Sequence, residues 1–84
     1  MENRIVVEVY LHKQNRRTDV EIPLDISANE LIIGLNEGLH LGYNTADLSQ
    51  CNLKTENPVA FLSGNKLLKE YGLHNGTIIN ITER

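Results

Sequence analysis

Residues 66–81 read KLLKEYGLHNGTIINI, which joins a leucine-rich turn, an Asn75-Gly76 break and a run of β-branched residues. The turn predicts a wrapped loop or a short 3₁₀ turn whose apolar residues close one end of a core, and residues 77–81 predict a final strand. Isoleucines at positions 78, 79 and 81 cover both faces of that strand. Strands that are apolar on both faces are typical of sheet interiors, so we expect this one to be central.

Near the start of the chain, two segments with a period of two predict a β-hairpin. In residues 5–11 the odd positions are apolar and predict the buried face, whereas the even positions form the outward set Val6, Glu8 and Tyr10. Residues 12–17 are polar and predict the hairpin loop, and the apolar alternation resumes from Val20 to Leu24. Pro23 has no backbone N–H to donate, so the second strand is expected at a sheet edge.

The middle of the chain predicts one helix. Residues 27–30 read SANE, a capping box in which Ser27 accepts from the backbone of Glu30 and the Glu30 side chain reaches back. Apolar residues then recur every four positions, and Gly42 supplies a stop. The helix is therefore expected from about Ala28 to Leu41.

Two glycines interrupt this helical pattern. Gly34 and Gly38 lie four residues apart, and each weakens a helix by roughly 1 kcal/mol relative to alanine. An interior glycine usually has a reason in local packing. We expect the helix to cross its own sheet closely at these positions, with a groove for a partner as the alternative.

The second half of the chain predicts short strands separated by turns. Residues 51–55 and 59–62 predict two strands around an Asn57-Pro58 turn, and residues 43–50 predict a loop. Taken with the hairpin, the helix and the final strand, the order predicts an α+β domain spanning residues 1–84, with a mixed sheet of about five strands and one helix across one face.

Composition narrows the class of partner and the compartment. Eight basic residues stand against eleven acidic ones, and this net charge of −3 disfavours nucleic acid. No apolar run approaches the roughly 18 residues of a membrane span, and Met1 to Arg4 do not begin a signal peptide. We expect a cytoplasmic protein that reaches the inner face of the membrane only through a partner, without direct membrane insertion.

The sequence offers little for catalysis or cofactor binding. His12, His40 and His74 have no metal-ligand spacing, and neither a catalytic triad pattern nor a phosphate-binding loop is present. Cys51 is the only cysteine, so it forms no intramolecular disulfide, and it is either a buried apolar residue or a reactive thiol. We expect no enzyme, no metal and no cofactor.

The segment from Leu67 to Gly76, the hairpin, the capped helix and the turns at Asn57-Pro58 and Ser63-Gly64 resemble the YukD/EsaB family. These are small ubiquitin-like proteins encoded with bacterial type VII (ESX) secretion systems, and the resemblance covers nearly the whole chain. It implies a ubiquitin-like β-grasp roll in which the last strand runs parallel to the first. It also implies a non-covalent adaptor or regulator of the export of WXG-type substrates, which binds a cytosolic region of a membrane component of the machinery.

Two other functions remain as alternatives. Ubiquitin-like covalent modifiers and sulfur carriers react through a terminal glycine, whereas residues 82–84 read TER and the nearby Gly76 precedes the strand expected to close the core. Conjugation is therefore not expected. The second alternative is a scaffold domain unrelated to secretion.

The candidate partner-binding residues lie on the hairpin. Tyr10 belongs to the outward set of the first strand, and Lys13, Arg16 and Arg17 are expected in the loop, where a solvated polar turn is the ordinary interpretation. Ubiquitin docks through an apolar sheet patch that includes its hairpin tip, and this basic tip has no such member. The expected partner is therefore a protein other than a ubiquitin receptor, bound through the outward face or the edge strand.

Overall fold

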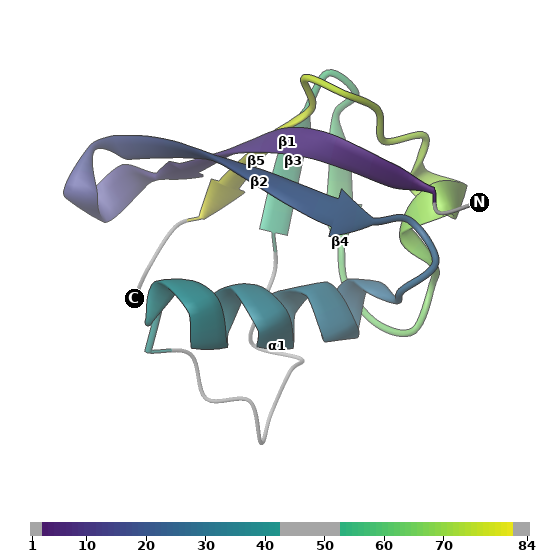
Figure 1. Ribbon diagram of the computed structural model, residues 1–84, viewed down its shortest axis with the longest axis horizontal. Coiled ribbons are helices and arrows are strands. Elements are labelled where there is room, and N and C mark those ends of the chain that lie inside the picture. Colours follow the sequence, from purple (N-terminus) through teal and green to yellow (C-terminus); the bar gives the residue numbers. More distant parts are fainter. Residues whose placement is uncertain (1–2, 43–52, 82–84) are drawn as a thin grey trace.

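The computed structural model describes residues 3–42 and 53–81 and shows a sheet with one helix across one face (Figure 1). Its five strands are β1 (Arg4–Leu11), β2 (Arg16–Pro23), β3 (Leu53–Glu56), β4 (Ala60–Leu62) and β5 (Ile78–Ile81). The helix is α1 (Ala28–Leu39), and two 3₁₀ segments are η1 (His12–Gln14) and η3 (Leu68–Tyr71). This is the predicted α+β, ubiquitin-like β-grasp arrangement.

The strand order is β2-β1-β5-β3-β4. β5 lies in the centre, parallel to β1, with Glu8 opposite Ile78 and Leu11 opposite Ile81. β2 pairs with β1 in antiparallel fashion and forms one edge. The central last strand and the edge position of the second strand are both as predicted.

The helix begins as its capping box predicts. The Glu30 N–H donates to Ser27 Oγ at 3.1 Å, and the Ser27 N–H donates to Glu30 Oε1 at 3.3 Å. α1 ends at Leu39, two residues before the predicted end, because His40 takes the left-handed conformation with φ of 53°. This turn directs Leu41 into the core, where it is 7% exposed, so the helix stops before the predicted glycine.

The two helix glycines do not make a close helix–sheet contact. Gly34 and Gly38 are both exposed, and a Cβ added at either position would meet no atom within 4 Å. The expectation of a tight crossing is therefore wrong. The side of α1 that faces the sheet is made of larger residues, namely Leu31, Ile32 and Leu35.

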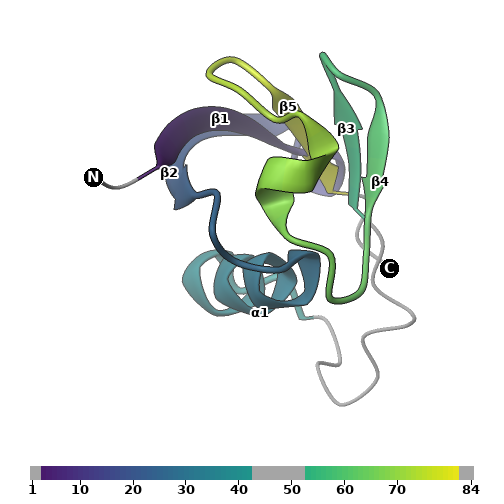
Figure 2. The same cartoon turned by 90° about the vertical axis from the view of Figure 1, so that its right-hand side faces the viewer.

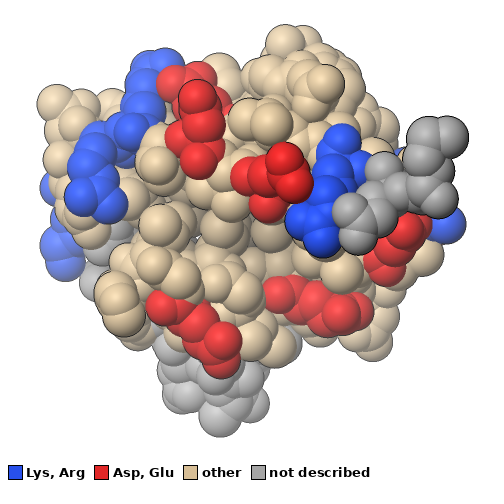
Figure 3. Space-filling view, in the orientation of Figure 1, with Lys and Arg blue, Asp and Glu red and all other residues tan. Residues whose placement is uncertain are grey.

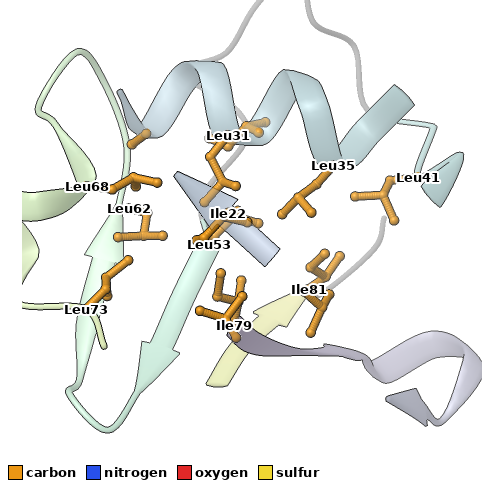
Figure 4. Packing of buried hydrophobic residues seen from close by; sticks show 14 of the residues in the cluster. Ile22, Leu31, Leu35, Leu41, Leu53, Leu62, Leu68, Leu73, Ile79 and Ile81 are labelled. Atoms are coloured by element: carbon orange, nitrogen blue, oxygen red, sulfur yellow. The ribbon is translucent and has the colours of Figure 1, made fainter. Parts of the chain in front are cut away.

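Aliphatic side chains from both layers fill the space between helix and sheet (Figure 4). Leu31 and Leu35 point from α1 toward Ile79 and Ile81 of the central strand. The segment η3 covers one end of this core, as Figure 2 shows, and places Leu68 there without any exposed surface. The leucine-rich stretch thus closes the core as the sequence predicts.

Two buried threonines hold the loops that follow β3 and precede β5. Thr77 Oγ1 donates to the Asn57 carbonyl at 2.9 Å and accepts from the His74 N–H at 3.0 Å. Thr55 Oγ1 donates to the Pro58 carbonyl at 2.7 Å. Both side chains are fully buried, and their hydroxyls satisfy main-chain groups that would otherwise lose hydrogen bonds to water.

Several element boundaries differ from the sequence prediction. The hairpin loop is shorter than residues 12–17, because Asn15 takes a left-handed conformation with φ of 48° and pairing resumes with Arg16 opposite Leu11. β3 ends at Glu56, one residue after its predicted end, and β4 begins at Ala60, one residue after its predicted start. Cys51 and the predicted loop over residues 43–50 lie outside the described residues.

Candidate functional site

The outer face of the sheet, opposite the helix, carries the residues that the sequence placed outward. Along β1 the even positions are exposed or half-buried and the odd positions are buried. Strand pairing aligns Tyr10 with Arg17 on β2 and with Asn80 on β5, and Asn80 with Lys54 on β3. One row of side chains therefore crosses the sheet from its β2 edge to its interior.

Tyr10 is the centre of this row. Its ring stacks on the His12 ring with centroids 4.1 Å apart and an interplanar angle of 26°. The Arg17 guanidinium carbon lies 4.7 Å from the centroid of the Tyr10 ring, within cation–π range. Tyr10 Oη donates to Asn15 Oδ1 at 3.0 Å. These contacts hold the aromatic ring in one orientation on an exposed face.

Hydrogen bonds extend this cluster over β5 and β3. His12 Nε2 lies 2.8 Å from Asn80 Oδ1, and Asn80 Nδ2 donates to Glu56 Oε2 at 3.1 Å and to the Lys54 carbonyl at 3.3 Å. Because the amide of Asn80 donates toward β3, its oxygen is available as the acceptor for an Nε2-protonated His12. The result is a continuous polar network from the hairpin to the third strand.

Arg17 also joins the cluster to β1, because its Nη1 donates to Glu8 Oε1 at 3.2 Å. Both side chains are partly exposed, so the ion pair is worth at most about 1 kcal/mol of stability and acts chiefly to position the guanidinium beside Tyr10. We name Tyr10, His12, Arg17 and Asn80 together the Tyr10 cluster.

The structure brings together only two of the four predicted binding residues. Arg16 and Arg17 are consecutive in β2 and therefore point to opposite faces of the sheet. Arg17 contacts Tyr10, whereas Arg16 pairs with the inward-facing Leu11. Lys13 is exposed in η1. The prediction that both arginines belong to the loop is wrong, because the turn closes at Asn15.

Sequence reasoning missed His12 and Asn80 as members of this surface. In the sequence, His12 stands out only as a possible metal ligand, and Asn80 lies in a strand that is predicted from its isoleucines. Their proximity depends on the parallel register of β1 and β5, which joins segments at opposite ends of the chain. A polar residue between two isoleucines of a central strand was the one available signal.

Apolar side chains also lie on the outer face. Val6 is 44% exposed and Phe61 is 65% exposed, and Phe61 stands opposite Lys54 at the β4 edge. The outer face thus carries an aromatic side chain toward each edge with polar residues between them. Such a mixture of exposed aromatics and hydrogen-bonding groups is typical of surfaces that bind proteins.

The described residues give no sign of a metal or membrane-spanning site. Within residues 3–42 and 53–81, no three His, Cys, Asp or Glu side chains gather as ligands. In the same part of the chain, no helix has both the length and the apolar character to cross a bilayer.

Comparison with solved structures finds ubiquitin-like folds. The ubiquitin-like domain from tubulin-binding cofactor B is 19% identical with a TM-score of 0.78, and covers 99% of this chain and 92% of its own. The C-terminal ubiquitin-like domain of mouse tubulin-specific chaperone e is 12% identical with a TM-score of 0.73, covering 99% and 89% respectively. The UBL domain of Plasmodium falciparum Dsk2 is 17% identical with a TM-score of 0.63, covering 94% and 99%. At these identities the likeness shows the fold alone.

Comparison with curated protein sequences finds no match. Comparison with protein families finds one that matches residues 5–81, from the first residue of the buried face of β1 to the end of β5. Its description is "WXG100 protein secretion system (Wss), protein YukD", which agrees with the resemblance carried by the leucine-rich turn and the capped helix. The chain therefore belongs to the YukD family of the WXG100 protein secretion system.

Proposed function

We propose that this protein is a non-covalent adaptor or regulator that binds a cytosolic part of the WXG100 secretion machinery through the outer face of its sheet. Membership of the YukD family links the chain to that secretion system. The observation that carries the choice of surface is the Tyr10 cluster, where an aromatic ring on an open face is held by three neighbouring side chains. A ring that is already ordered loses little side-chain entropy when a partner covers it.

A protein partner suits this surface better than a small ligand. The outer face is a sheet surface with Val6 and Phe61 exposed and with charged groups of both signs. A domain of this size offers a modest interface, roughly 1,200–1,600 Å² in total for both partners. We expect reversible binding to a cytosolic region of a membrane component, which brings this cytoplasmic protein to the inner face of the membrane.

The internal glycine favours the non-covalent mode over conjugation. Gly76 lies two residues before the start of β5, and its N–H donates to the Val6 carbonyl at 3.0 Å. Cleavage after Gly76 would remove the central strand, whose Ile79 and Ile81 are fully buried. Exposing that glycine as a reactive terminus would therefore destroy the core.

The test is export of WXG100 proteins from a strain that lacks this gene and is complemented with variants. Tyr10→Ala and Arg17→Glu should reduce export and co-purification with secretion components, because each dismantles the Tyr10 cluster. Arg16→Glu is the matched control, since it makes the same charge change one residue away on the opposite face. Tyr10→Phe keeps the ring and should retain most activity.

Cellular levels of each variant, measured by immunoblot, separate lost binding from lost folding. The proposal fails if deletion of the gene leaves export and substrate levels unchanged and no secretion component co-purifies with the wild type. In that case a scaffold role unrelated to secretion takes its place. If Arg16→Glu and Arg17→Glu have equal effects, the outer face is not the binding surface.

A further inference from the structure

A groove lies between the edge strand β2 and the helix α1, away from the Tyr10 cluster. Its volume is about 230 Å³, and it is lined mainly by apolar residues of these two elements and of the connection between them, among them Val20, Ile22, Ile26, Leu31 and Gly34. This is below the roughly 300–1,000 Å³ of typical small-molecule pockets. The groove therefore has room for a few side chains rather than for a cofactor.

Gly34 keeps this groove open. The residue is exposed, lines the groove, and has no atom within 4 Å of the position that a Cβ would occupy. Helix propensity alone would favour alanine here, by roughly 1 kcal/mol. A larger residue at position 34 would project into the groove, whereas Gly38 one turn later is equally open but does not line it.

The main chain of β2 beside the groove can accept another strand. The Leu24 N–H donates to the Asn3 carbonyl at 2.8 Å, which places the hydrogen-bonded positions of the antiparallel pair at every second residue from Leu24. The N–H and C=O groups of Asp19 and Glu21 therefore face the open edge. No strand in the described part of the chain lies beyond β2.

Pro23 shortens the part of this edge that can pair, but it does not close the edge. By the same alternation its nitrogen faces the open edge, so the missing N–H removes no hydrogen bond to β1. An added strand would lose one donor at Pro23 but would keep the N–H and C=O pairs of Asp19 and Glu21. The edge is limited in length rather than closed.

The acidic residues around the groove determine which kind of peptide segment would be complementary to this edge. Glu21 and Glu30 line the groove from its two sides, and Asp19 is exposed on the same edge strand. Figure 3 shows acidic side chains on both sides of an uncharged strip on this face. A strand laid along β2 would alternate between side chains that face the groove and side chains that stand beside Asp19 and Glu21. Apolar residues suit the first set, and lysine or arginine suits the second.

We propose that β2 and the adjoining groove bind an extended segment of a protein partner, in which apolar residues alternate with basic ones, as an added strand of the sheet. The inference deepens the proposed function by adding a second surface and the chemistry of its occupant. A second copy of this chain fits less well. Antiparallel β2 pairing centred on Val20 or Glu21, beside the groove, would place carboxylates opposite one another, which is destabilising.

The test uses purified protein and a synthetic peptide of about nine residues, within the usual length of a strand, in which valine or isoleucine alternates with lysine. Binding should shift the backbone amide signals of Asp19, Glu21 and Gly34 in nuclear magnetic resonance spectra more than those of the outer face. Affinity should fall as salt rises, because the charge pairs are exposed. A peptide with glutamate in place of lysine should not bind.

Gly34→Leu should weaken peptide binding about tenfold or more, because the leucine side chain would occupy the groove. Gly38→Leu should bind the peptide about as well as the wild type. Both variants change an exposed helix glycine, so a melt of each shows whether folding is preserved. Asp19→Lys provides a second variant that leaves the groove intact and should also weaken binding.

The proposal is overturned if Gly34→Leu binds as well as Gly38→Leu, if the acidic peptide binds equally, or if the largest shifts surround Tyr10. A concentration-dependent dimer that Gly34→Leu dissociates, seen by sedimentation, would assign the groove to a second copy instead. Because the peptide assay needs no secretion machinery, its outcome is independent of the export test. Tyr10→Ala should still bind the peptide.

Discussion

The inner and outer faces of the sheet come from the same strands but differ in what holds their side chains. On the inner face Val7, Val9, Ile79 and Ile81 have no exposed surface and are held by mutual contact. On the outer face Tyr10 is held by one stack, one cation–π contact and one hydrogen bond. Side chains on the inner face are held by close packing, and Tyr10 on the outer face is held by directional contacts with its neighbours.

The difference separates stability from function. Removing buried aliphatic groups loses hydrophobic free energy and leaves a cavity, whereas exposed polar contacts are each worth a fraction of that. We therefore expect inner-face substitutions to unfold the protein and outer-face substitutions to change binding while leaving the fold intact. Three measurements of the free energy of unfolding test how far stability depends on burial, in order of decreasing effect.

The largest effect is expected from Leu35→Ala on the inner side of α1. Leu35 is 5% exposed and belongs to the core, so the truncation should lower the free energy of unfolding by roughly 2–5 kcal/mol. Denaturant unfolding followed by circular dichroism measures this change. Glu37→Ala, on the exposed side of the same helix, should stay within about 0.5 kcal/mol. Equal melts for the two variants would show that Leu35 is not part of the core.

An intermediate effect is expected from Thr77→Val. The substitution keeps the shape of the side chain but leaves the Asn57 carbonyl and the His74 N–H without their buried partner. This should lower the free energy of unfolding by about 1–3 kcal/mol. Thr18→Val, at a half-buried position of the edge strand, is the control. Thermal unfolding of both variants gives the comparison. A Thr77→Val protein as stable as the control would mean that the hydroxyl hydrogen bonds add nothing.

The smallest effect, and one of opposite sign, is expected from Gly38→Ala on the exposed side of α1. The new methyl group meets no atom within 4 Å, so helix propensity should raise stability by up to about 1 kcal/mol. Gly42→Ala should instead be destabilising, because Gly42 has φ of +77°. Calorimetry of the pair tests both signs. A destabilised Gly38→Ala would reveal a contact that this helix surface does not show.

The parts of the fold that were predicted are those encoded by local pattern. The capping box fixed the start of α1 to the residue, and the alternation of β1 assigned both of its faces. The end of the helix was misplaced because Leu41 is drawn into the core after a left-handed His40, and neither event leaves a local signature. The polar run at residues 12–17 is compatible both with a turn and with an exposed edge strand, so the sequence does not show where the loop ends and β2 begins.

The candidate site was predicted only in part for the same reason. Tyr10 was placed outward by period alone, but its contact with Arg17 required the hairpin register and its link to Asn80 required the parallel pairing with β5. Gly34 is an unusual residue for a helix interior, yet the sequence alone does not show whether a sheet or an open groove lies beside it. The face on which a residue lies follows from the local sequence pattern, whereas its neighbours on other strands depend on how distant segments pair.

The parallel pairing of β1 with β5 sets the order in which the chain can fold during synthesis. The hairpin and α1 are made first, but the sheet has no centre until Ile78–Ile81 is released to pair with residues 8–11. Until then the aliphatic faces of β1 and α1 have no β5 to cover them, and non-local pairing of this kind is slow. The nascent chain thus exposes aggregation-prone surface until β5 has left the ribosome, and a chaperone that shields the hairpin would matter most before that point.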